Sequence, residues 1–261
     1  MAKLSAGERQ EQITELLKSN GTMKVTELAK YFGVSRETIR KDLITLDDSG
    51  AVEKWFGRAV PVHNFNVSPI EKRLHANEQQ KIEICQKAFD YIPEDAILYI
   101  DTGSTPLWMA KLLSQRAGFR IITASLPAVN ELMGSGNEII MTGGTMNPTI
   151  SGAVGVQPVK FLERLKFDVA LLGTAGFSRH AGPTTNTFDD ADIKKVVIEN
   201  SQTNIVLSDS RKTTYSSLVC YADWEEIDYL ITDSGMDQEV VRELSEHTEV
   251  IQVEQAGRVS P

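Results

Sequence analysis

The stretch Ser35-Arg36-Glu37-Thr38-Ile39-Arg40-Lys41-Asp42-Leu43 decides how the N-terminal part of the chain folds. Its first residue is a serine, which can accept a hydrogen bond from a free backbone N–H group in the first turn of a helix. Ile39, Leu43 and Leu46 follow at the spacing that places apolar side chains on one face of a helix. The stretch therefore predicts a capped helix with one buried side.

The other side of this predicted helix is mostly polar and basic. Such a helix can enter the major groove of DNA, where arginine binds guanine edges and lysine, serine and threonine bind phosphates. An ordinary helix with a solvated charged face is equally consistent with these nine residues alone. The residues on this side or flanking it are Arg36, Thr38, Arg40, Lys41, Ile44 and Thr45.

The residues before Ser35 favour the DNA-binding interpretation. The segment Lys24–Phe32 predicts a second helix with one apolar face, and Thr26 stands where its N-cap is expected. Gly33-Val34 then supplies a tight turn. A helix, a short turn with glycine and a capped basic helix form the helix-turn-helix pattern. Glu8–Ser19 predicts a supporting helix in front of it.

A short β-hairpin is predicted after this helix. Asp47–Gly50 ends the helix, and the segment Ala51–Val62 has strand-like residues on both sides of Gly57, which suits a tight turn. A helix-turn-helix followed by a hairpin is a winged version, and Arg58 at the hairpin tip could reach the DNA backbone or the minor groove. The predicted DNA-binding residues are Thr26, Ser35, Arg36, Thr38, Arg40, Lys41 and Arg58.

The order of these residues resembles a known signature. Arg9 and Ile13, followed by Ser35-x-x-Thr38-Ile39-Arg40-Lys41-Asp42-Leu43, are similar to the N-terminal signature of the DeoR family of bacterial sugar-metabolism regulators. The resemblance covers the predicted helix-turn-helix and hairpin. It implies that this part of the chain is the DNA-binding head of a transcriptional regulator.

The composition is that of a folded protein. The chain has 261 residues, of which 41% are hydrophobic, enough for one large or two modest domains. No run approaches the ~18 apolar residues of a membrane helix, and the N-terminus has no apolar signal segment. We therefore expect a cytoplasmic protein with no membrane partner. Cys85 and Cys220 are interpreted as buried thiols rather than as a pair.

The charge is distributed unevenly along the chain. The net charge of −9 is unfavourable for binding DNA. Residues 1–62, however, hold ten Lys and Arg against nine Asp and Glu, a net of +1, whereas residues 63–261 hold seventeen against twenty-seven, a net of −10. The acidic excess thus lies outside the predicted head. Because the head is only mildly basic, we expect tight binding to need two or more heads on one DNA site.

A linker and an α/β domain are predicted after the head. Residues 63–77 have mixed charge and little periodicity, which indicates a linker, and Arg73, Glu78 and Lys81 are interpreted as surface residues. From residue 78 onward helical and strand patterns alternate, which predicts a largely parallel sheet with helices on both faces. The predicted fold class is two-domain α/β, with an N-terminal winged helix-turn-helix at 1–62 and a C-terminal α/β domain at 78–261. The predicted strands are 96–100, 120–123, 138–141, 168–172, 204–207, 227–231 and 249–253, and the predicted helices are 78–92, 105–113, 126–132, 159–165, 190–200 and 238–247.

Polar loops follow the first five predicted strands. In a parallel sheet, ligands bind beyond the carboxyl ends of the strands. Glycine lets the backbone bend there, and hydroxyl groups and free N–H groups at a helix start can bind an anion. Five such loops at one sheet edge indicate a polar pocket for a small anionic ligand. The loops are Asp101-Thr102-Gly103-Ser104-Thr105, Thr123-Ala124-Ser125, Thr142-Gly143-Gly144-Thr145, Gly173-Thr174-Ala175-Gly176 and Asp209-Ser210-Arg211-Lys212.

These loops also resemble those of the DeoR-family effector domain and, more distantly, those of ribose-5-phosphate isomerase. The resemblance implies a pocket for a phosphorylated sugar, with Thr102–Thr105 on the phosphate and Lys212 nearby. At Ala124 the family usually has asparagine, so a donor and an acceptor for sugar hydroxyls are missing. The predicted effector-binding residues are Asp101, Thr102, Gly103, Ser104, Thr105, Thr123, Ser125, Gly143, Gly144, Gly173, Lys194, Asp209 and Lys212.

Patterns typical of enzymes and metal sites are absent from the sequence. The four histidines are scattered, no pair has metal-ligand spacing, and no nucleophile elbow, Walker loop or dinucleotide motif is present. The enzymatic alternative is sugar-phosphate isomerisation, which needs a carboxylate base. Asp189, Asp190 and Asp192 could serve as that base, but we interpret them as acids at the start of the helix 190–200, where they interact favourably with the helix dipole.

The sequence therefore predicts a cytoplasmic transcriptional regulator, with repression as the expected mode. Its predicted partners are double-stranded operator DNA, a phosphorylated sugar effector and further copies of itself in a dimer or tetramer. We expect no cofactor and no metal. Two alternatives remain open: a sugar-phosphate isomerase with an appended DNA-binding head, and an interaction protein whose N-terminal helices only mediate assembly.

Overall fold

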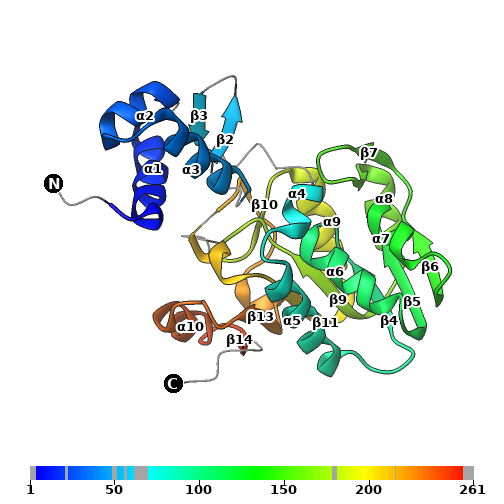
Figure 1. Ribbon diagram of the computed structural model, residues 1–261. Helices are drawn as coiled ribbons and strands as arrows, with labels where there is room; N and C mark the ends of the chain where they lie inside the picture. Colours follow the sequence, from blue (N-terminus) through cyan, green and yellow to red (C-terminus); the bar gives the residue numbers. More distant parts are fainter. Residues whose placement is uncertain are drawn as a thin grey trace. The chain divides into compact units, whose positions relative to one another are not determined.

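The computed structural model describes residues 4–20, 23–48, 52–55, 58–61, 70–177, 181–214 and 216–254. The chain divides into two compact units, Met1–Ser68 and Pro69–Pro261, which are coloured along the sequence in Figure 1. In the described residues, no helix is both long enough and apolar enough to span a bilayer.

The first unit contains the predicted helix-turn-helix and hairpin. Its helices are packed around a small core in which Ile13, Leu17, Leu28, Ile39 and Leu43 are completely buried. The two strands of the hairpin pair antiparallel, and a short strand before α2 adds to them in the order β1-β3-β2. The elements are α1 (Ala6–Asn20), β1 (Met23–Lys24), α2 (Val25–Phe32), α3 (Arg36–Asp48), β2 (Val52–Trp55) and β3 (Arg58–Pro61). The predicted hairpin tip, Gly57, lies outside the described residues.

The turn between α2 and α3 follows the expected chemistry. Gly33 has φ 63°, a left-handed conformation that favours glycine and ends α2. Ser35 caps α3, because its Oγ accepts a hydrogen bond from the Thr38 N–H at 3.0 Å. The predicted cap at Thr26 is wrong. The N-cap of α2 is Lys24, whose N–H donates to the Glu27 carboxylate at 2.7 Å, so the helix begins one residue before Thr26.

The second unit is built on a seven-stranded sheet, and every strand pair in it is parallel. The strand order is β14-β13-β11-β9-β4-β5-β6, so the first strand of the domain lies in the interior of the sheet. This confirms the predicted parallel α/β domain. The strands are β4 (Ile97–Ile100), β5 (Ala117–Thr123), β6 (Gly136–Met141), β9 (Phe167–Gly173), β11 (Ser201–Leu207), β13 (Tyr229–Asp233) and β14 (Glu249–Val253).

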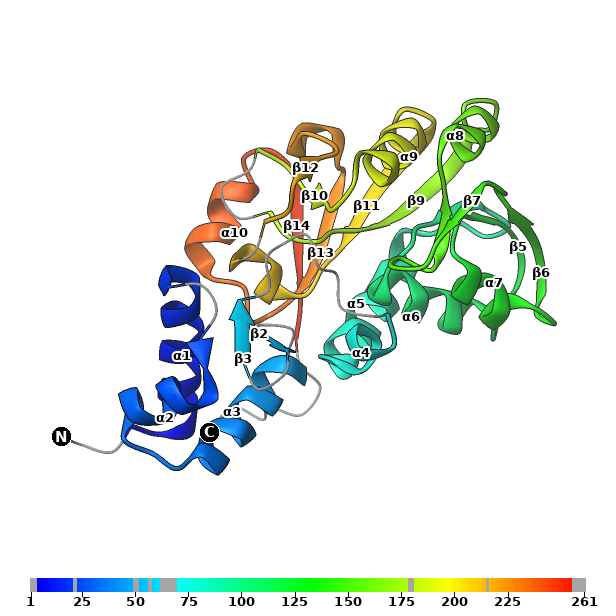
Figure 2. The same ribbon diagram turned by 90° about the horizontal axis from the view of Figure 1, so that it is seen from above.

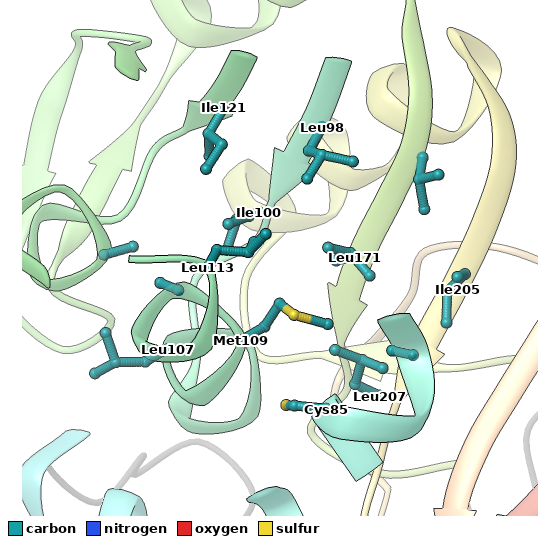
Figure 3. Close-up of a cluster of buried hydrophobic side chains, with 14 of the residues drawn as sticks. Cys85, Leu98, Ile100, Leu107, Met109, Leu113, Ile121, Leu171, Ile205 and Leu207 are labelled. Atoms are coloured by element: carbon teal, nitrogen blue, oxygen red, sulfur yellow. The ribbon is translucent and has the colours of Figure 1, made fainter. Parts of the chain in front are cut away.

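Helices cover both faces of this sheet (Figure 2). Because side chains alternate along a strand, Leu98 and Ile100 point to one core and Tyr99 to the other. In the first core, Figure 3 shows Cys85 of α5 and Met109 of α6 near Leu207 of β11. This core lies under α4 (Ile70–His75), α5 (Glu78–Ala88), α6 (Ser104–Leu113) and α7 (Leu126–Leu132), and the second lies under α8 (Val156–Leu162), α9 (Phe188–Glu199) and α10 (Gln238–Leu244).

Three features of this unit differ from the sequence-based expectation. Residues 70–75, predicted as part of a linker, form α4, because Ile70 is buried in the first core and the Leu74 carbonyl accepts from Trp108 Nε1 at 3.1 Å. Two small antiparallel strand pairs also lie outside the main sheet. They are β7 (Thr145–Asn147) with β8 (Gly152–Val154), and β10 (Thr184–Thr185) with β12 (Val219–Cys220).

Candidate functional site

The strand order creates a topological switch point between β4 and β9 at the carboxyl edge of the sheet. From β4 the chain continues to β5 and β6 on one side, whereas β9 pairs with the other side of β4. Connections that leave two neighbouring strands in opposite directions open the crevice in which α/β proteins bind ligands. Asp101 follows β4 and Gly173 ends β9, and the Gly173 N–H donates to Asp101 Oδ2 at 2.8 Å. Two predicted site residues thus meet at this switch point.

A buried acidic trio lies at this switch point. It consists of Asp101, Asp190 and Lys194, whose exposed fractions are 1%, 5% and 2%. The Lys194 ammonium pairs with Asp101 and lies 3.5 Å from Asp190 Oδ2. Burial raises the pKa of Asp101 to about 6, against the effect of Lys194 and with the help of the nearby Asp190 charge. With both carboxylates ionised, two negative charges against one positive charge leave a net of −1.

Hydroxyl groups surround this trio. Thr102 Oγ1 donates to Asp190 Oδ1 at 3.3 Å, and Thr185 Oγ1 donates to the other oxygen of the same carboxylate. The Tyr221 hydroxyl donates to the Gly173 carbonyl at 2.9 Å, and its ring lies under the Lys194 ammonium, 5.2 Å from the ring centroid. Asp101, Thr102, Gly173 and Lys194 were predicted from the sequence and belong to one network.

A basic cluster is formed by side chains of α4, of the start of α5 and of the loop after β11. It consists of Arg73, Lys81, Arg211 and Lys212 around the single carboxylate of Asp209, which is 2% exposed and accepts from Arg211 Nε at 3.0 Å. Lys81 is also buried, and its ammonium donates to the Arg73 carbonyl. The interpretation of Lys81 as a surface residue is therefore wrong. Four basic side chains thus lie around the buried Asp209 carboxylate.

The pKa values of the two lysines reflect their surroundings. Burial lowers the pKa of Lys81 to about 8; the charge of Asp209 opposes this shift, and the charges of Lys212, Arg211 and Arg73 add to it. Burial also lowers the pKa of Lys212, again with Asp209 opposing and Arg73 and Arg211 adding to the shift. Within the part of the chain that the structure describes, the Lys212 ammonium has no hydrogen-bonded or ion-paired partner. The cluster is therefore short of negative charge.

The start of α6 provides unsatisfied donors near this cluster. Gly103 precedes the helix with φ 140°, and the first N–H groups of a helix have no partner within it. Ser104 and Thr105 are each 8% exposed, and among the described residues their hydroxyl groups have no hydrogen-bond partner. The Thr105 carbonyl accepts from Cys85 Sγ at 3.3 Å, one turn of α5 after Lys81, so α6 begins beside the helix that carries this lysine.

The predicted loops after β5 and β6 have a different role from the loops at the switch point. Thr123 Oγ1 donates to the Ile100 carbonyl at 2.6 Å, and Ser125 Oγ caps α7 by accepting from the Ala128 N–H at 3.3 Å. Gly143 has φ 69°, and a side chain at Gly144 would come within 2.9 Å of the Val154 carbonyl. These residues stabilise turns at the carboxyl edge of the sheet, and no described contact joins them to the trio or to the cluster.

Several residues of the site were missed by the sequence analysis. Asp190 does lie in the first turn of α9, as expected, but its side chain is buried against Lys194 rather than solvated, whereas Asp189 and Asp192 are exposed. The spacing of Asp190 and Lys194, four residues apart on one helix, is a signal for this pair. Lys81 lies four residues before the buried Cys85, and this spacing places the two on the same face of α5. The contacts of Thr185 and Tyr221 have no comparable signal in the sequence.

The helix α3 exposes its predicted polar face to solvent. Arg36, Arg40, Lys41 and Thr45 are exposed, and Arg40 Nη1 lies 3.3 Å from Glu37 Oε2. Ser35 Oγ and Thr38 Oγ1 are 2.8 Å apart at the start of the helix. Ile44 is also on this face and is 47% exposed. The side chain of Arg58 lies outside the described residues.

Asp42 fixes α3 against α1 from the buried side. Its carboxylate accepts from Arg9 Nε at 2.6 Å and from Arg9 Nη2 at 3.0 Å, and Gln10 Nε2 donates to it at 3.2 Å. Asp42 is 3% exposed. The acid within the predicted recognition motif thus positions the helix rather than facing DNA.

The chain combines a helix-turn-helix unit with an α/β unit that has polar residues at its switch point. This combination is typical of a transcriptional regulator that carries a sensor domain. The sequence matches the model of the DeoR-like helix-turn-helix domain over residues 9–65 and that of the DeoR C terminal sensor domain over residues 76–234. The chain belongs to the DeoR family of transcriptional regulators and is not an enzyme.

Known relatives extend over nearly the whole chain. The HTH-type transcriptional regulator GlpR of Haloferax volcanii is 31% identical over 241 residues, which cover 91% of this chain and 93% of the relative. The glycerol-3-phosphate regulon repressor of Escherichia coli K12 is 28% identical over 242 residues, covering 92% and 96%. Ribose 5-phosphate isomerase A of Methanocaldococcus jannaschii covers 52% of this chain and 54% of its own with 18% identity and a TM-score of 0.39, a likeness too low to support a functional argument.

Proposed function

We propose that the protein represses a sugar-utilisation operon in the cytoplasm and that a phosphorylated sugar controls this repression. The helix α3 binds the operator, and the switch point of the sensor domain binds the effector. One observation supports the choice of a phosphorylated ligand above all others: the free donors at the start of α6 lie on the same side of the sheet as the basic cluster, in which Lys81 and Asp209 are buried.

A phosphate group matches this arrangement chemically. It carries a charge of about −1.5 to −2 near neutral pH and three strong acceptor oxygens. The N–H groups of the first α6 turn and the hydroxyls of Ser104 and Thr105 are donors, and the helix dipole adds a partial positive charge. Lys212 supplies a desolvated ammonium without an ion-paired partner among the described residues. Among the relatives, the Escherichia coli protein is a glycerol-3-phosphate regulon repressor, which also favours a phosphorylated ligand.

Oligomerisation follows from the weak charge of the head. The head has a net charge of only +1 by sequence, so one copy neutralises few phosphates and binds DNA weakly at physiological salt. Two heads on one operator bind more tightly, because the second binds at a high effective concentration. We therefore propose a dimer or tetramer whose heads contact half-sites about 34 Å, or a multiple of it, apart.

Substitutions on α3 test the DNA-binding part of this proposal. We expect Arg40→Ala to weaken binding to the operator by ~1–3 kcal/mol, because an arginine that reads a base edge contributes about this much discrimination. Lys41→Ala is expected to weaken binding to all sequences and to reduce the salt dependence, as for a phosphate contact. A mobility-shift titration at several salt concentrations separates the two effects. Normal operator binding by both variants would show that another element reads the DNA.

A pH titration tests the basic cluster. The pKa of Lys81 is about 8, so its positive charge is lost as the pH rises through this value. We expect sugar-phosphate affinity to fall roughly tenfold between about pH 7 and pH 9, as one charge-assisted hydrogen bond is lost. Lys81→Met should remove this dependence, whereas Lys87→Met, on the exposed end of the same helix, should retain it.

Unfolding cannot account for this expected loss of binding. The unfolded chain holds the Lys81 proton up to its ordinary pKa of 10.5, above the folded value of about 8. Over this interval the unfolded state binds more protons, so this group makes the folded state more stable as the pH rises. A thermal-shift measurement with and without sugar phosphate at each pH reports both quantities, since a ligand raises the apparent stability by mass action. Constant affinity from about pH 7 to pH 9 would exclude Lys81 from the site.

A further inference from the structure

The exposed face of α3 carries an apolar side chain near its centre. Ile44 is 47% exposed, although isoleucine is among the residue types that proteins bury most often. At about 100° per residue, Ile44 lies roughly 140° around the helix from Ile39, which is completely buried in the core of the head. The Ile44 side chain therefore points away from that core. A single exposed isoleucine is ordinary on a protein surface, so its meaning depends on its neighbours.

Ile44 belongs to a row of four exposed side chains on this face. The row consists of Glu37, Arg40, Lys41 and Ile44, which follow one another at intervals of three, one and three residues. This spacing places them on one side of the helix over two turns. The recognition helices of homeodomains contact bases in the major groove through four residues at the same spacing. The row is therefore placed to meet base edges when α3 lies in the groove.

The polar members of the row match base edges that form hydrogen bonds, and Ile44 does not. Arginine and lysine donate to guanine, and glutamate accepts from the amino group of cytosine. Arg40 and Glu37 also lie side by side, with Arg40 Nη1 3.3 Å from Glu37 Oε2. A hydrocarbon side chain can neither donate nor accept. The apolar group that bases present in the major groove is the 5-methyl group of thymine, so this group is the match for Ile44.

DNA fits this face better than a protein partner does. The centres of protein interfaces are depleted in charged residues, whereas Ile44 is surrounded by Glu37, Arg40 and Lys41. Within the described part of α3, Ile44 is also the one large apolar side chain that is exposed. Arg36, Arg40 and Lys41 supply exposed positive charge, which phosphates on either side of a groove attract. The surroundings of Ile44 are thus those of a side chain that enters a groove.

From this arrangement we infer that Ile44 contacts the methyl group of one thymine in each operator half-site and that it determines the preference for thymine there. The inference rests on the proposed binding of the operator by α3. It adds one base of the operator and the residue that recognises it. Burial of one methyl group changes affinity about threefold to fourfold. Ile44 thus selects among bases, while the basic side chains supply most of the attraction to DNA.

The test replaces thymine by deoxyuridine, which lacks the methyl group and keeps every hydrogen-bonding group. A duplex that the full chain binds tightly is first selected from a random library, and each of its thymines is then replaced in turn. In mobility-shift titrations we expect one position in each half-site at which the replacement weakens wild-type binding about threefold to fourfold. If no replacement weakens binding by the wild-type protein, the inference is overturned.

Ile44→Ala shows whether this residue is the one that contacts the methyl group. We expect the variant to bind the thymine duplex about threefold to fourfold more weakly than the wild type and to bind the thymine and deoxyuridine duplexes equally well. A loss of stability would weaken binding to both duplexes alike, so it cannot imitate this result. Val156→Ala, at an exposed valine of α8, is the matched control and should keep the wild-type difference. A difference that persists in Ile44→Ala would show that another residue contacts the methyl group, and would overturn the inference.

Arg40→Ala and Lys41→Ala distinguish failure of this inference from failure of the proposed role of α3. If these variants bind the selected duplex weakly while the wild type ignores the loss of every methyl group, α3 still binds the operator and only the contact of Ile44 is wrong. If both variants bind the duplex normally, α3 is not the element that binds the operator, and the inference falls with the proposed role.

Discussion

Replacing Lys212 by alanine is expected to abolish the response to the effector while leaving operator affinity without effector unchanged. Lys212 belongs to the basic cluster, and its ammonium has no ion-paired partner in the described part of the chain. If the proposed phosphate-binding role of Lys212 holds, the substitution removes one charged contact, an expected loss of ~1.5–3 kcal/mol or roughly 10–100-fold in effector affinity. Because burial disfavours the charged lysine, the substitution is expected to cost little stability.

The decisive measurement is operator affinity with and without sugar phosphate for the wild type and for Lys212→Ala. A ligand can shift the DNA-binding equilibrium only through its different affinity for the two states of the regulator. Lys160→Ala, on the exposed surface of α8, is the matched control and should respond like the wild type. An unchanged response in Lys212→Ala would show that the sensor uses another site. Loss of operator binding without effector would show that Lys212 is needed for the fold.

Replacing Asp42 by alanine is expected to destabilise the head by about 3 kcal/mol, because it leaves the Arg9 guanidinium without its partner in a mostly buried position. The bidentate contact, at 2.6 and 3.0 Å, and the hydrogen bond from Gln10 are all lost together. The head has a small core, so this change is a large part of its stability. We therefore expect operator binding to fall steeply, although Asp42 itself does not face DNA.

A double-mutant cycle separates this stability effect from DNA contact. In Arg9→Met/Asp42→Leu both charges are replaced by apolar groups, which for a buried pair is often neutral or stabilising. We expect the double variant to regain most of the stability in a thermal melt and to bind the operator again. If Asp42→Ala melts like the wild type but does not bind DNA, then Asp42 contacts DNA and the positioning role is wrong.

Most of the fold could be predicted because it depends on local patterns. The stripe Ile39, Leu43 and Leu46 and the cap at Ser35 define α3 without reference to the rest of the chain. The alternation of helices and strands likewise predicted the parallel sheet. What failed depended on tertiary contacts: α4 is stabilised by burial of Ile70 and by the Trp108 hydrogen bond, neither of which can be read from residues 70–75 alone.

The candidate site was predictable only where the loops themselves carry the signal. Asp101, Gly173 and Asp209 follow strands, so the rule for carboxyl ends identified them. Lys81 and Tyr221 follow no strand of the main sheet. Their roles depend on which elements pack against the switch point, and that information lies in the tertiary fold. The chemistry of Lys81 in particular depends on its burial, which a single lysine in a polar segment does not reveal.

The interior position of β4 also determines when each part of the chain can fold. Leu98 and Ile100 pair with Val169 and Leu171 of β9, which follows two other strands of the same sheet and several helices in the chain. During synthesis, β4 therefore keeps one edge open until β9 has left the ribosome, and unpaired strand edges favour aggregation. The head depends only on contacts among its own helices and hairpin, so it can form much earlier. We expect nascent chains to acquire DNA-binding structure before they can sense any effector, and mutations that slow closure of the β4–β9 pair should act through solubility rather than affinity.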